Sequence, residues 1–454
     1  MKINSSQLIP LSFFAAIIVG TILLDLPIAT ASGTSAGLVT SLFTSTTSIC
    51  VTGLVVVDSY AYWSLFGKIV ILILIQLGGL GVISVTSILM LMISKRISLS
   101  SSVLLHDAFN LTSISGLKKF IFGVFKGTFL VEAIGAFFYM TVFIPKFGVA
   151  KGIWVSVFNS ISSFCNAGID ILGPDSLIQY STNPLVVINT MVLIILGGLG
   201  YVVWFDINNA VRDMLVNRNS GKSLSFRIRK LSEHTKLVLT LTFFLIVIGA
   251  VCVFIMEYDN PDTIGNMSMG DKILNSIFQS VTFRTAGFAT VPQQNLTEPT
   301  CVVGSIMMFI GGSPVGTAGG VKTVTFFAII ANAVAFIRNR NETVLFGRKL
   351  SRDLIQKSTA IVTVSFFITI ICMILIMMTN QVGITDAMYE TFSATATVGL
   401  SRALTPQLNV AGRLIIIVAM YLGRIGPISM ALFFNYSGIE RNNIKYIKGN
   451  FFVG

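Results

Sequence analysis

The sequence predicts an all-α integral membrane protein built from four consecutive repeats. Its mean hydropathy is +0.84, and 54% of its 454 residues are hydrophobic while only 11% are charged. The apolar residues form long blocks instead of alternating at the period of an amphipathic helix or strand, which indicates that lipid surrounds the fold. A short motif that ends in glycine and an apolar residue recurs at Gly53, Gly168, Gly287 and Gly399, with a spacing of roughly 115 residues. This spacing predicts four similar units.

A short helix-like run, apolar or rich in Ser and Thr, precedes each of these glycines. The runs are 38–49, 152–164, 271–283 and 384–396. They are too short to cross a bilayer, which takes about 20 helical residues, but longer apolar stretches flank each one. Each unit is therefore expected to contain a first span (M1), a short pore helix, a glycine loop and a second span (M2). Four such units in the same direction predict a pseudo-four-fold pore.

The boundaries of the spans follow from the apolar blocks and the charged residues that end them. The M1 spans are expected at 8–24, 120–144, 237–256 and 359–379, and the M2 spans at 66–94, 185–205, 302–337 and 414–434. The first run is interpreted as a membrane helix and not as a signal peptide, because the residues around Pro27 make a poor cleavage site. The repeats are expected at 1–95, 96–212, 213–345 and 346–454, the third with its M2 broken by a loop at 311–320 and the fourth ending in a short cytoplasmic tail.

The distribution of charge predicts the orientation in the membrane. The net charge is +12, but most of the 31 Lys and Arg residues lie in the loops between repeats, which favours the positive-inside pattern over nucleic-acid binding. Both termini of this multi-pass protein of the cell membrane are therefore expected in the cytoplasm. The loops inside the repeats carry an excess of acidic residues: Asp25, Asp58, Asp170, Asp175, Glu257, Asp259, Asp262, Glu298, Asp386 and Glu390. These would either steer cations toward an outer vestibule or simply be solvated.

Residues for covalent or metal chemistry are few. The five cysteines show no CxxC spacing, and the two histidines, His106 and His234, lie in polar loops without a second ligand nearby. No nucleophile–base pair is apparent, so the sequence predicts neither an enzyme nor a covalent cofactor. A secondary transporter for an organic solute is also disfavoured, because such folds are typically built from inverted repeats.

The glycine loops are the candidate site. A dehydrated cation needs a ring of oxygens, which backbone carbonyls pointing into a narrow axis can supply. Glycine permits the backbone conformations that such a loop requires. The candidate filter residues, with K⁺ as the bound ion, are Cys50, Val51, Thr52, Gly53, Cys165, Asn166, Ala167, Gly168, Thr285, Ala286, Gly287, Thr397, Val398 and Gly399. Because the residues before the glycines differ between repeats, only the glycine carbonyl layer is expected to be uniform, and selectivity is expected to be loose.

The third M2 span contains a stretch that cannot be a stable helix interior. Residues 311–320 include five glycines and a proline, each of which costs roughly 1 to 3 kcal/mol inside a helix. The stretch is either a packing kink or a flexible loop beneath the filter. The candidate gate residues are Gly311, Gly312, Ser313, Pro314, Gly316, Gly319, Gly320 and Arg424.

Arg424 lies midway along the predicted span 414–434. A charge at that depth costs about 2.5 to 3.5 kcal/mol, so the side chain must face protein or water. One interpretation pairs it with Glu132 or with loop carbonyls. The other places its positive charge in the pore below the filter.

Five segments together resemble the Trk/Ktr/HKT potassium transporter superfamily, nearly from end to end. They are Phe278-Gln279-Ser280-Val281 before Arg284-Thr285-Ala286-Gly287-Phe288, Gly311-Gly312-Ser313-Pro314, Thr317-Ala318-Gly319-Gly320-Val321-Lys322-Thr323, Thr397-Val398-Gly399-Leu400-Ser401 and Gly423-Arg424-Ile425-Gly426-Pro427. The chain enters its first repeat at once, without extra N-terminal helices, and so is most similar to the Ktr-type membrane subunits (KtrB). One departure is Val315, where the family usually has Gly or Ser, and a stiffer loop is expected there.

The resemblance implies potassium uptake through a homodimer in which each protomer has its own pore. It also implies control by a cytosolic ring of nucleotide-binding RCK subunits (KtrA-like), favours a gate at 311–320 with Arg424 in the pore, and leaves open a dependence on Na⁺. The alternative is a sodium-conducting or weakly selective cation transporter of the same fold. In related plant transporters Ser in the first loop accompanies sodium preference, so Gly53 favours potassium.

Overall fold

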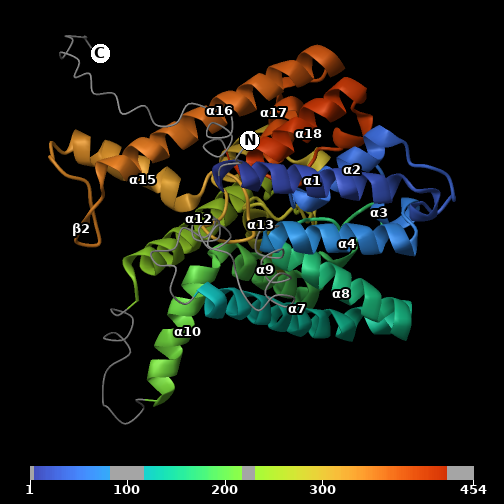
Figure 1. The fold of residues 1–454 in the computed structure, drawn as a ribbon, viewed down its shortest axis with the longest axis horizontal. Helices are drawn as coiled ribbons and strands as arrows, with labels where there is room; N and C mark the ends of the chain where they lie inside the picture. Colours follow the sequence, from blue (N-terminus) through green and yellow to red (C-terminus); the bar gives the residue numbers. More distant parts are fainter. Residues whose placement is uncertain (1–4, 82–116, 217–230, 427–454) are drawn as a thin grey trace.

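The computed structural model describes residues 5–81, 117–216 and 231–426. Within these ranges the chain is helical apart from loops and one short two-stranded ribbon (Figure 1). The longer elements are α1 Ser5–Asp25, α2 Leu38–Ile49, α3 Ser59–Tyr62, α4 Leu65–Leu80, α7 Leu117–Phe147, α8 Val149–Cys165, α9 Pro184–Leu199, α10 Tyr201–Val216, α12 Glu233–Glu257, α13 Met269–Thr282, α14 Glu298–Phe309, α15 Thr323–Ile337, β1 Val344–Leu345, β2 Arg348–Lys349, α16 Arg352–Asn380, α17 Ile384–Thr395 and α18 Val410–Ile425. Single 3₁₀ turns lie at Pro27–Ala29, Ile178–Tyr180, Gln293–Asn295 and Thr405–Gln407.

The four predicted M1 spans are confirmed as α1, α7, α12 and α16, each of which contains the predicted range. Three of them, over Phe120–Phe147, Glu233–Glu257 and Arg352–Asn380, are long and apolar enough on their own to cross a membrane. Their outward faces are apolar: Phe137, Ile255 and Met378 are 65%, 68% and 73% exposed. An apolar exterior of this kind is what a lipid environment requires.

The four predicted pore helices are also confirmed, as α2, α8, α13 and α17. They lie at the centre of the molecule although they are rich in hydroxyl side chains, and residues 44–48 of α2, all Ser or Thr, are buried. Several of these hydroxyls donate to the backbone carbonyl four residues earlier, as Ser48 does to Thr44 (2.6 Å). The polar interior and apolar surface reverse the usual arrangement of a soluble protein.

The M2 spans are shorter than predicted. The sequence foresaw a break only in the third repeat, where α14 and α15 indeed flank a non-helical stretch. The prediction of one span at 185–205 was wrong, because α9 ends at Leu199 and the chain bends by 100° between α9 and α10. α4 and α18 also stop early, at Leu80 and Ile425, and the rest of their predicted spans lies outside the described residues.

Glycine explains these three early helix ends. Gly81, Gly200 and Gly426 follow α4, α9 and α18 with φ of 83°, 90° and 85° and ψ of 125°, 141° and 146°. This conformation is strained for residues with a Cβ atom and stops the helical hydrogen bonding. The motif Leu-Gly-Gly-Leu-Gly at 77–81 and 196–200 thus ends a helix in both places.

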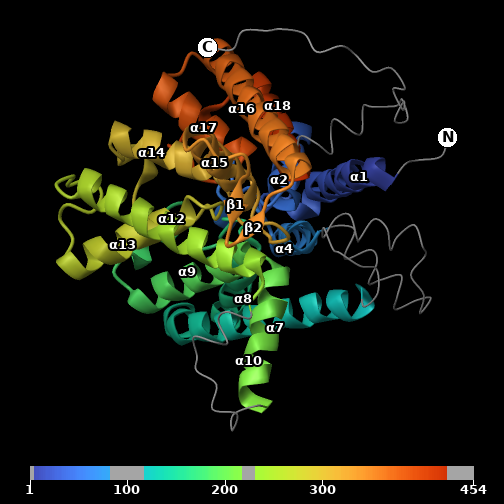
Figure 2. The same ribbon diagram turned by 90° about the vertical axis from the view of Figure 1, so that its left-hand side faces the viewer.

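The helices form a closed ring around one axis. Each M1 packs on the pore helix of its own repeat, in the pairs α1–α2, α7–α8, α12–α13 and α16–α17. Each M2 packs on the pore helix of the next repeat, in the pairs α4–α8, α9–α13, α14–α17 and α18–α2. Figure 2 shows the four groups of helices arranged in chain order around the centre. The fourth repeat therefore closes onto the first.

The predicted orientation depends on segments outside the described residues. These segments include Lys95-Arg96, the basic residues of 217–230 and the tail from 427 onward. The cytoplasmic position of both termini therefore stays a prediction. The repeat boundaries at 95, 212 and 345 stay predictions as well.

Candidate ion filter and gate loop

The four glycine loops share one unusual backbone conformation. Two residues before each glycine, a residue with a side chain adopts positive φ: 55° at Val51, 58° at Asn166, 67° at Thr285 and 53° at Thr397. The glycines themselves have φ of 100° at Gly53, 65° at Gly168, 82° at Gly287 and 98° at Gly399. Three of the four non-glycine residues are β-branched, for which positive φ is a costly outlier. Such strain is typically retained at functional sites.

Alternation of left- and right-handed conformations orients the peptide groups of a chain. In each loop the residue between the two positive-φ positions has negative φ, so handedness alternates over three residues. Successive amide groups then lie on one side of the chain and successive carbonyl groups on the other. This is the backbone geometry from which a carbonyl-lined cation filter is built.

The four loops meet in a ring. A Cβ atom added to any of the glycines would collide with the carbonyl oxygen that precedes the glycine of the next repeat. The colliding pairs are Gly53 with Ala167 (2.5 Å), Gly168 with Ala286 (2.6 Å), Gly287 with Val398 (2.6 Å) and Gly399 with Thr52. The pairs run from repeat 1 to 2, 2 to 3, 3 to 4 and 4 to 1, so the ring is closed. All four positions therefore have no room for a side chain.

Hydroxyl groups of the pore helices hold these loops, a role that the sequence analysis missed. Thr47 Oγ1 accepts a hydrogen bond from the Gly53 amide and Ser393 Oγ from the Gly399 amide, both at 3.0 Å. Ser162 donates to the Ile169 carbonyl (2.5 Å) and Thr282 to the Phe288 carbonyl (2.6 Å). The sequence does carry a signal for this role. A hydroxyl residue lies six positions before the glycine in the first, second and fourth repeats, and five positions before it in the third.

A cavity of about 510 Å³ opens on one side of the ring. All four glycines line it, together with Asp58, Asp170 and Asp175. Burial raises the pKa of Asp170 to about 6, so this carboxyl group is mostly ionised at neutral pH. Three carboxylates around one mouth attract cations, which favours the steering interpretation for these residues.

Acidic residues outside this cavity fix the surrounding loops through their hydrogen bonds and ion pairs. Glu257 accepts hydrogen bonds from the Thr297 amide and hydroxyl and from the Thr263 hydroxyl, at 2.8 to 2.9 Å. Asp386 forms an ion pair with Arg402 at 3.0 Å. Glu390 is fully buried and accepts from the Ser401 (2.6 Å) and Thr405 hydroxyls. These carboxylates fix the loops that surround the ring.

The segment between α14 and α15 is a loop folded back on itself. Ile310 and Val321 form an isolated parallel bridge, and the Gly311 amide donates to the Val321 carbonyl (2.9 Å). The Thr323 amide donates to the Gly312 carbonyl (3.1 Å). Val315 has a φ of 61°, a strained value for a β-branched residue, consistent with the stiffening expected there.

This loop lies against the ends of two pore helices. The Thr317 hydroxyl donates to the Phe164 carbonyl at the end of α8 (3.1 Å), and the Ser313 and Thr317 amides donate to the Gly198 (3.0 Å) and Gly197 (3.1 Å) carbonyls. A Cβ atom added at Gly319 would collide with the Thr397 hydroxyl in the fourth filter loop. The candidate gate residues 311–320 therefore lie directly beside the ring, on the side opposite the acidic cavity.

Arg424 joins this loop to the first repeat. Its guanidinium donates to the carbonyl oxygens of Thr317 and Gly78, both at 2.5 Å. The alternative ion pair with Glu132 was wrong: that carboxylate instead accepts from the Gln76 amide (3.1 Å). The contacts match the other structural interpretation, in which Arg424 donates to loop carbonyls. The same contacts place the positive charge next to the candidate gate.

Comparisons with known proteins agree with this geometry. The model of the TrkH family, described as cation transport proteins, matches residues 11–442. The chain is 37% identical over its whole length to the Ktr system potassium uptake protein B of Bacillus subtilis, covering 98% of that protein. It is 35% identical to the potassium/sodium uptake protein NtpJ of Enterococcus hirae, over 94% of this chain and 91% of that one. It is also 35% identical to the Ktr system potassium uptake protein B of Vibrio alginolyticus, over 100% and 96%.

The fold has a solved counterpart in the potassium transporter TrkH of Vibrio parahaemolyticus. The two structures superpose with a TM-score of 0.74 at 14% identity, over 95% of this chain and 84% of the other. This likeness concerns the fold alone. The match over residues 11–442 and the full-length identities show that the chain belongs to the TrkH family of cation transport proteins.

Proposed function

We propose that this multi-pass membrane protein is the ion-conducting subunit of a Ktr-type potassium uptake system. The observation that carries the proposal is the closed ring of four glycines, each preceded by a residue at positive φ. Potassium enters from the acidic cavity, loses water at the ring and is coordinated by carbonyl oxygens of the fourteen filter residues. The names of the Bacillus and Vibrio relatives as potassium uptake proteins support the same ion.

A sodium-conducting or weakly selective transporter is the second candidate. The residues before the glycines differ between repeats, so only part of the ring is chemically uniform. The Enterococcus relative is named a potassium/sodium uptake protein, which also supports a role for Na⁺, either as a transported ion or as an ion on which uptake depends. Comparing potassium and sodium uptake in a host that lacks its own potassium transporters separates the two candidates.

The proposed gate is the loop 311–320 with Arg424. The loop blocks the path on the inner side of the ring, and Arg424 fixes it to the first repeat through Gly78. Opening then requires Arg424 to release the Thr317 carbonyl and the loop to leave the ends of α8 and the fourth filter loop. The proposed repeats are 1–95, 96–212, 213–345 and 346–454, with the gate in the third.

The proposal also covers the oligomeric state and a regulatory partner. We propose a homodimer controlled by a cytosolic nucleotide-binding ring of the RCK type, as the Ktr system names of relatives suggest a system of several components. The ribbon β1–β2 lies near the start of α12, where Arg348 pairs with Glu233 at 3.0 Å, and the exposed Arg338 and Arg340 precede it in the chain. Docking near this ribbon would act on the gate loop through α15. Anionic lipid is the other occupant that suits these charges.

The filter prediction concerns Gly53→Ser. The side chain has no room against the Ala167 carbonyl and disfavours φ of 100°, so the substitution deforms the ring. We expect the ratio of potassium to sodium uptake to fall while the protein still inserts into the membrane. Gly383→Ser is the matched control, because a Cβ atom there meets nothing within 4 Å. An unchanged ratio in correctly inserted Gly53→Ser protein contradicts the filter assignment.

The gate prediction concerns two variants, deletion of residues within 311–320 and Arg424→Ala. Loss of the Arg424 hydrogen bonds, each worth about 1.5 to 3 kcal/mol, raises the weight of the open state by at least about tenfold. We expect both variants to increase potassium flux, measured in proteoliposomes. The control is Arg413→Ala, whose side chain, within the described part of the chain, bonds the Pro406 and Leu408 carbonyls. If both gate variants insert normally and conduct less than the parent, the loop supports the pore instead of blocking it.

The partner prediction concerns purification from the native membrane in mild detergent. We expect a soluble nucleotide-binding subunit to co-purify and potassium transport to respond differently to ATP and ADP. Transport that is indifferent to both nucleotides, with no soluble subunit bound, removes the regulatory half of the proposal. The filter and the gate are tested separately by the two preceding experiments.

A further inference from the structure

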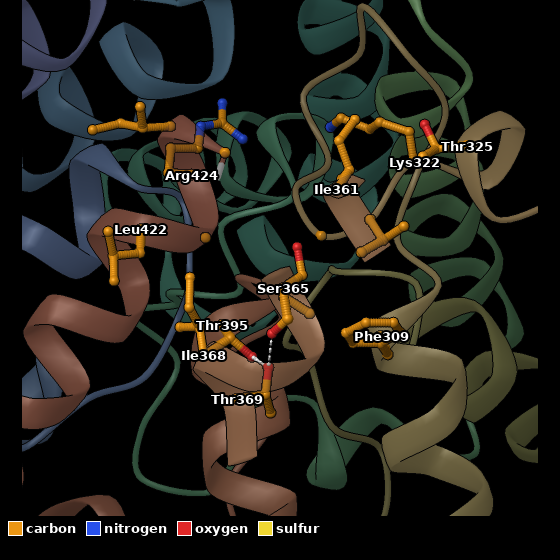
Figure 3. A pocket seen from close by; sticks show the side chains of 16 residues that line it. Phe309, Lys322, Thr325, Ile361, Ser365, Ile368, Thr369, Thr395, Leu422 and Arg424 are labelled. Atoms are coloured by element: carbon orange, nitrogen blue, oxygen red, sulfur yellow. Dashed lines mark hydrogen bonds between the residues drawn. The ribbon is translucent and has the colours of Figure 1, made fainter. Parts of the chain in front are cut away.

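Two neighbouring cavities lie between the third and fourth repeats, and the first of them borders the proposed gate at Gly320 and Arg424. The first holds about 240 Å³ and lies between the start of α15, the middle of α16 and the end of α18 (Figure 3). The second holds about 410 Å³ and lies between α14, the start of α15 and α16. Phe309 lines both, so the two cavities adjoin.

The first cavity carries two positive charges. Lys322 and Arg424 both line it, and Figure 3 shows their charged ends at the same end of the cavity. Lys322 donates to the Ala318 carbonyl (2.6 Å), and Arg424 donates to the Thr317 and Gly78 carbonyls. Among the residues that the structure describes, neither cation has a carboxylate within ion-pair distance. Two like charges in a partly buried cavity are costly unless an anion joins them.

The start of α15 adds to the same preference. Its N-cap residue is Lys322, which makes no side-chain cap; the Thr323 amide of the first turn donates to the Gly312 carbonyl. Helix N-termini attract anions because their amides and the helix dipole point toward them. Thr325 in that first turn and Ser365 on α16 bring hydroxyl donors to the cavity wall. Two cations, a helix start without a side-chain cap and two hydroxyls form a site of the size and chemistry of a phosphate group.

The second cavity has the opposite chemistry. Its lining consists of Ile306, Phe309, Phe326, Val362, Thr363, Phe366 and Phe392. Ile306 is 55% and Phe366 46% exposed, so the groove faces the surroundings of the bundle. α16 is long and apolar enough to span a membrane, so those surroundings are lipid. An apolar groove next to a phosphate-sized cationic cavity suits a ligand with a charged head and a hydrocarbon chain.

We propose that one anionic phospholipid binds between the third and fourth repeats, its phosphate between Lys322 and Arg424 and one acyl chain in the Phe309–Phe366 groove. A free phosphate ion would use the first cavity and leave the groove without a role. A neutral phospholipid such as phosphatidylcholine carries the same phosphate charge, but its quaternary ammonium group would bring a third cation close to Lys322 and Arg424.

The proposal has a functional consequence, which rests on the gate proposed above. A lipid phosphate competes with the Thr317 carbonyl for Arg424 and so weakens the contact that holds the gate loop. Anionic lipid would therefore raise potassium flux. The binding site itself does not depend on that function, and the two are tested separately.

Binding is measured by native mass spectrometry of the purified full chain in detergent, with phosphatidylglycerol and phosphatidylcholine of identical acyl chains. We expect retained phosphatidylglycerol to exceed phosphatidylcholine, and Lys322→Gln to lower phosphatidylglycerol retention about fivefold. Lys357→Gln is the control, because that lysine is exposed on α16 and lines neither cavity. Phe366→Ser should also lower retention, whereas Phe367→Ser, at the adjacent exposed position, should not.

Three outcomes overturn the site: equal retention of the two lipids, the same effect from Lys322→Gln and Lys357→Gln, or displacement of the lipid by millimolar inorganic phosphate with no effect of Phe366→Ser. Lys322→Arg, which keeps the charge, should retain the lipid and guards against a folding defect in Lys322→Gln. Flux is then compared in liposomes that differ only in phosphatidylglycerol content. Binding without a change in flux leaves the lipid site and refutes its action on the gate.

Discussion

The constraint on which this structure depends is that a cation crossing lipid must exchange its water for a complete shell of oxygen atoms. No single loop of this chain can provide that shell. Each contributes one glycine and its preceding carbonyls, and the ring closes only because Gly399 of the fourth repeat meets Thr52 of the first. The order of the helices repeats the same closure, since α18 packs on α2 as α4 packs on α8. The ring of loops and the ring of helices therefore close in the same order, from the fourth repeat to the first.

The loop 311–320, the proposed gate, is joined to the end of the pore helix α8 by a hydrogen bond. The Phe164 carbonyl, at the end of α8, has no intrahelical partner and accepts instead from the Thr317 hydroxyl of the gate loop. Gly78, Gly197 and Gly423 lie so close to the carbonyls of Ile49, Phe164 and Thr395 that none of them could carry a side chain. In the first, second and fourth repeats the described M2 helix thus ends close to where it meets a pore helix. Movement of the loop would therefore break its hydrogen bond to the end of α8.

The sequence predicted the parts of this fold that hydropathy and repetition encode. α2 was predicted at its observed limits, and the M1 helices were found because long apolar blocks have one stable conformation in lipid. The end of α9 at Leu199 was missed, because a glycine in an apolar run suits a continuous helix as well as a broken one and only the Pro314 carbonyl beside Gly200 distinguishes them. The partners of Arg424 were left open for a similar reason: Gly78 is 346 residues away, and only the tertiary fold brings that carbonyl to the guanidinium.

The central claim, that four unequal loops form one cation site, is tested most directly by crystals grown in potassium and then exchanged into thallium or rubidium. Anomalous scattering locates these ions independently of the protein atoms. The account predicts a peak on the axis of the ring, within coordination distance of carbonyl oxygens from all four loops that end at Gly53, Gly168, Gly287 and Gly399. A peak confined to the acidic cavity at Asp58, Asp170 and Asp175, with none inside the ring, would contradict it.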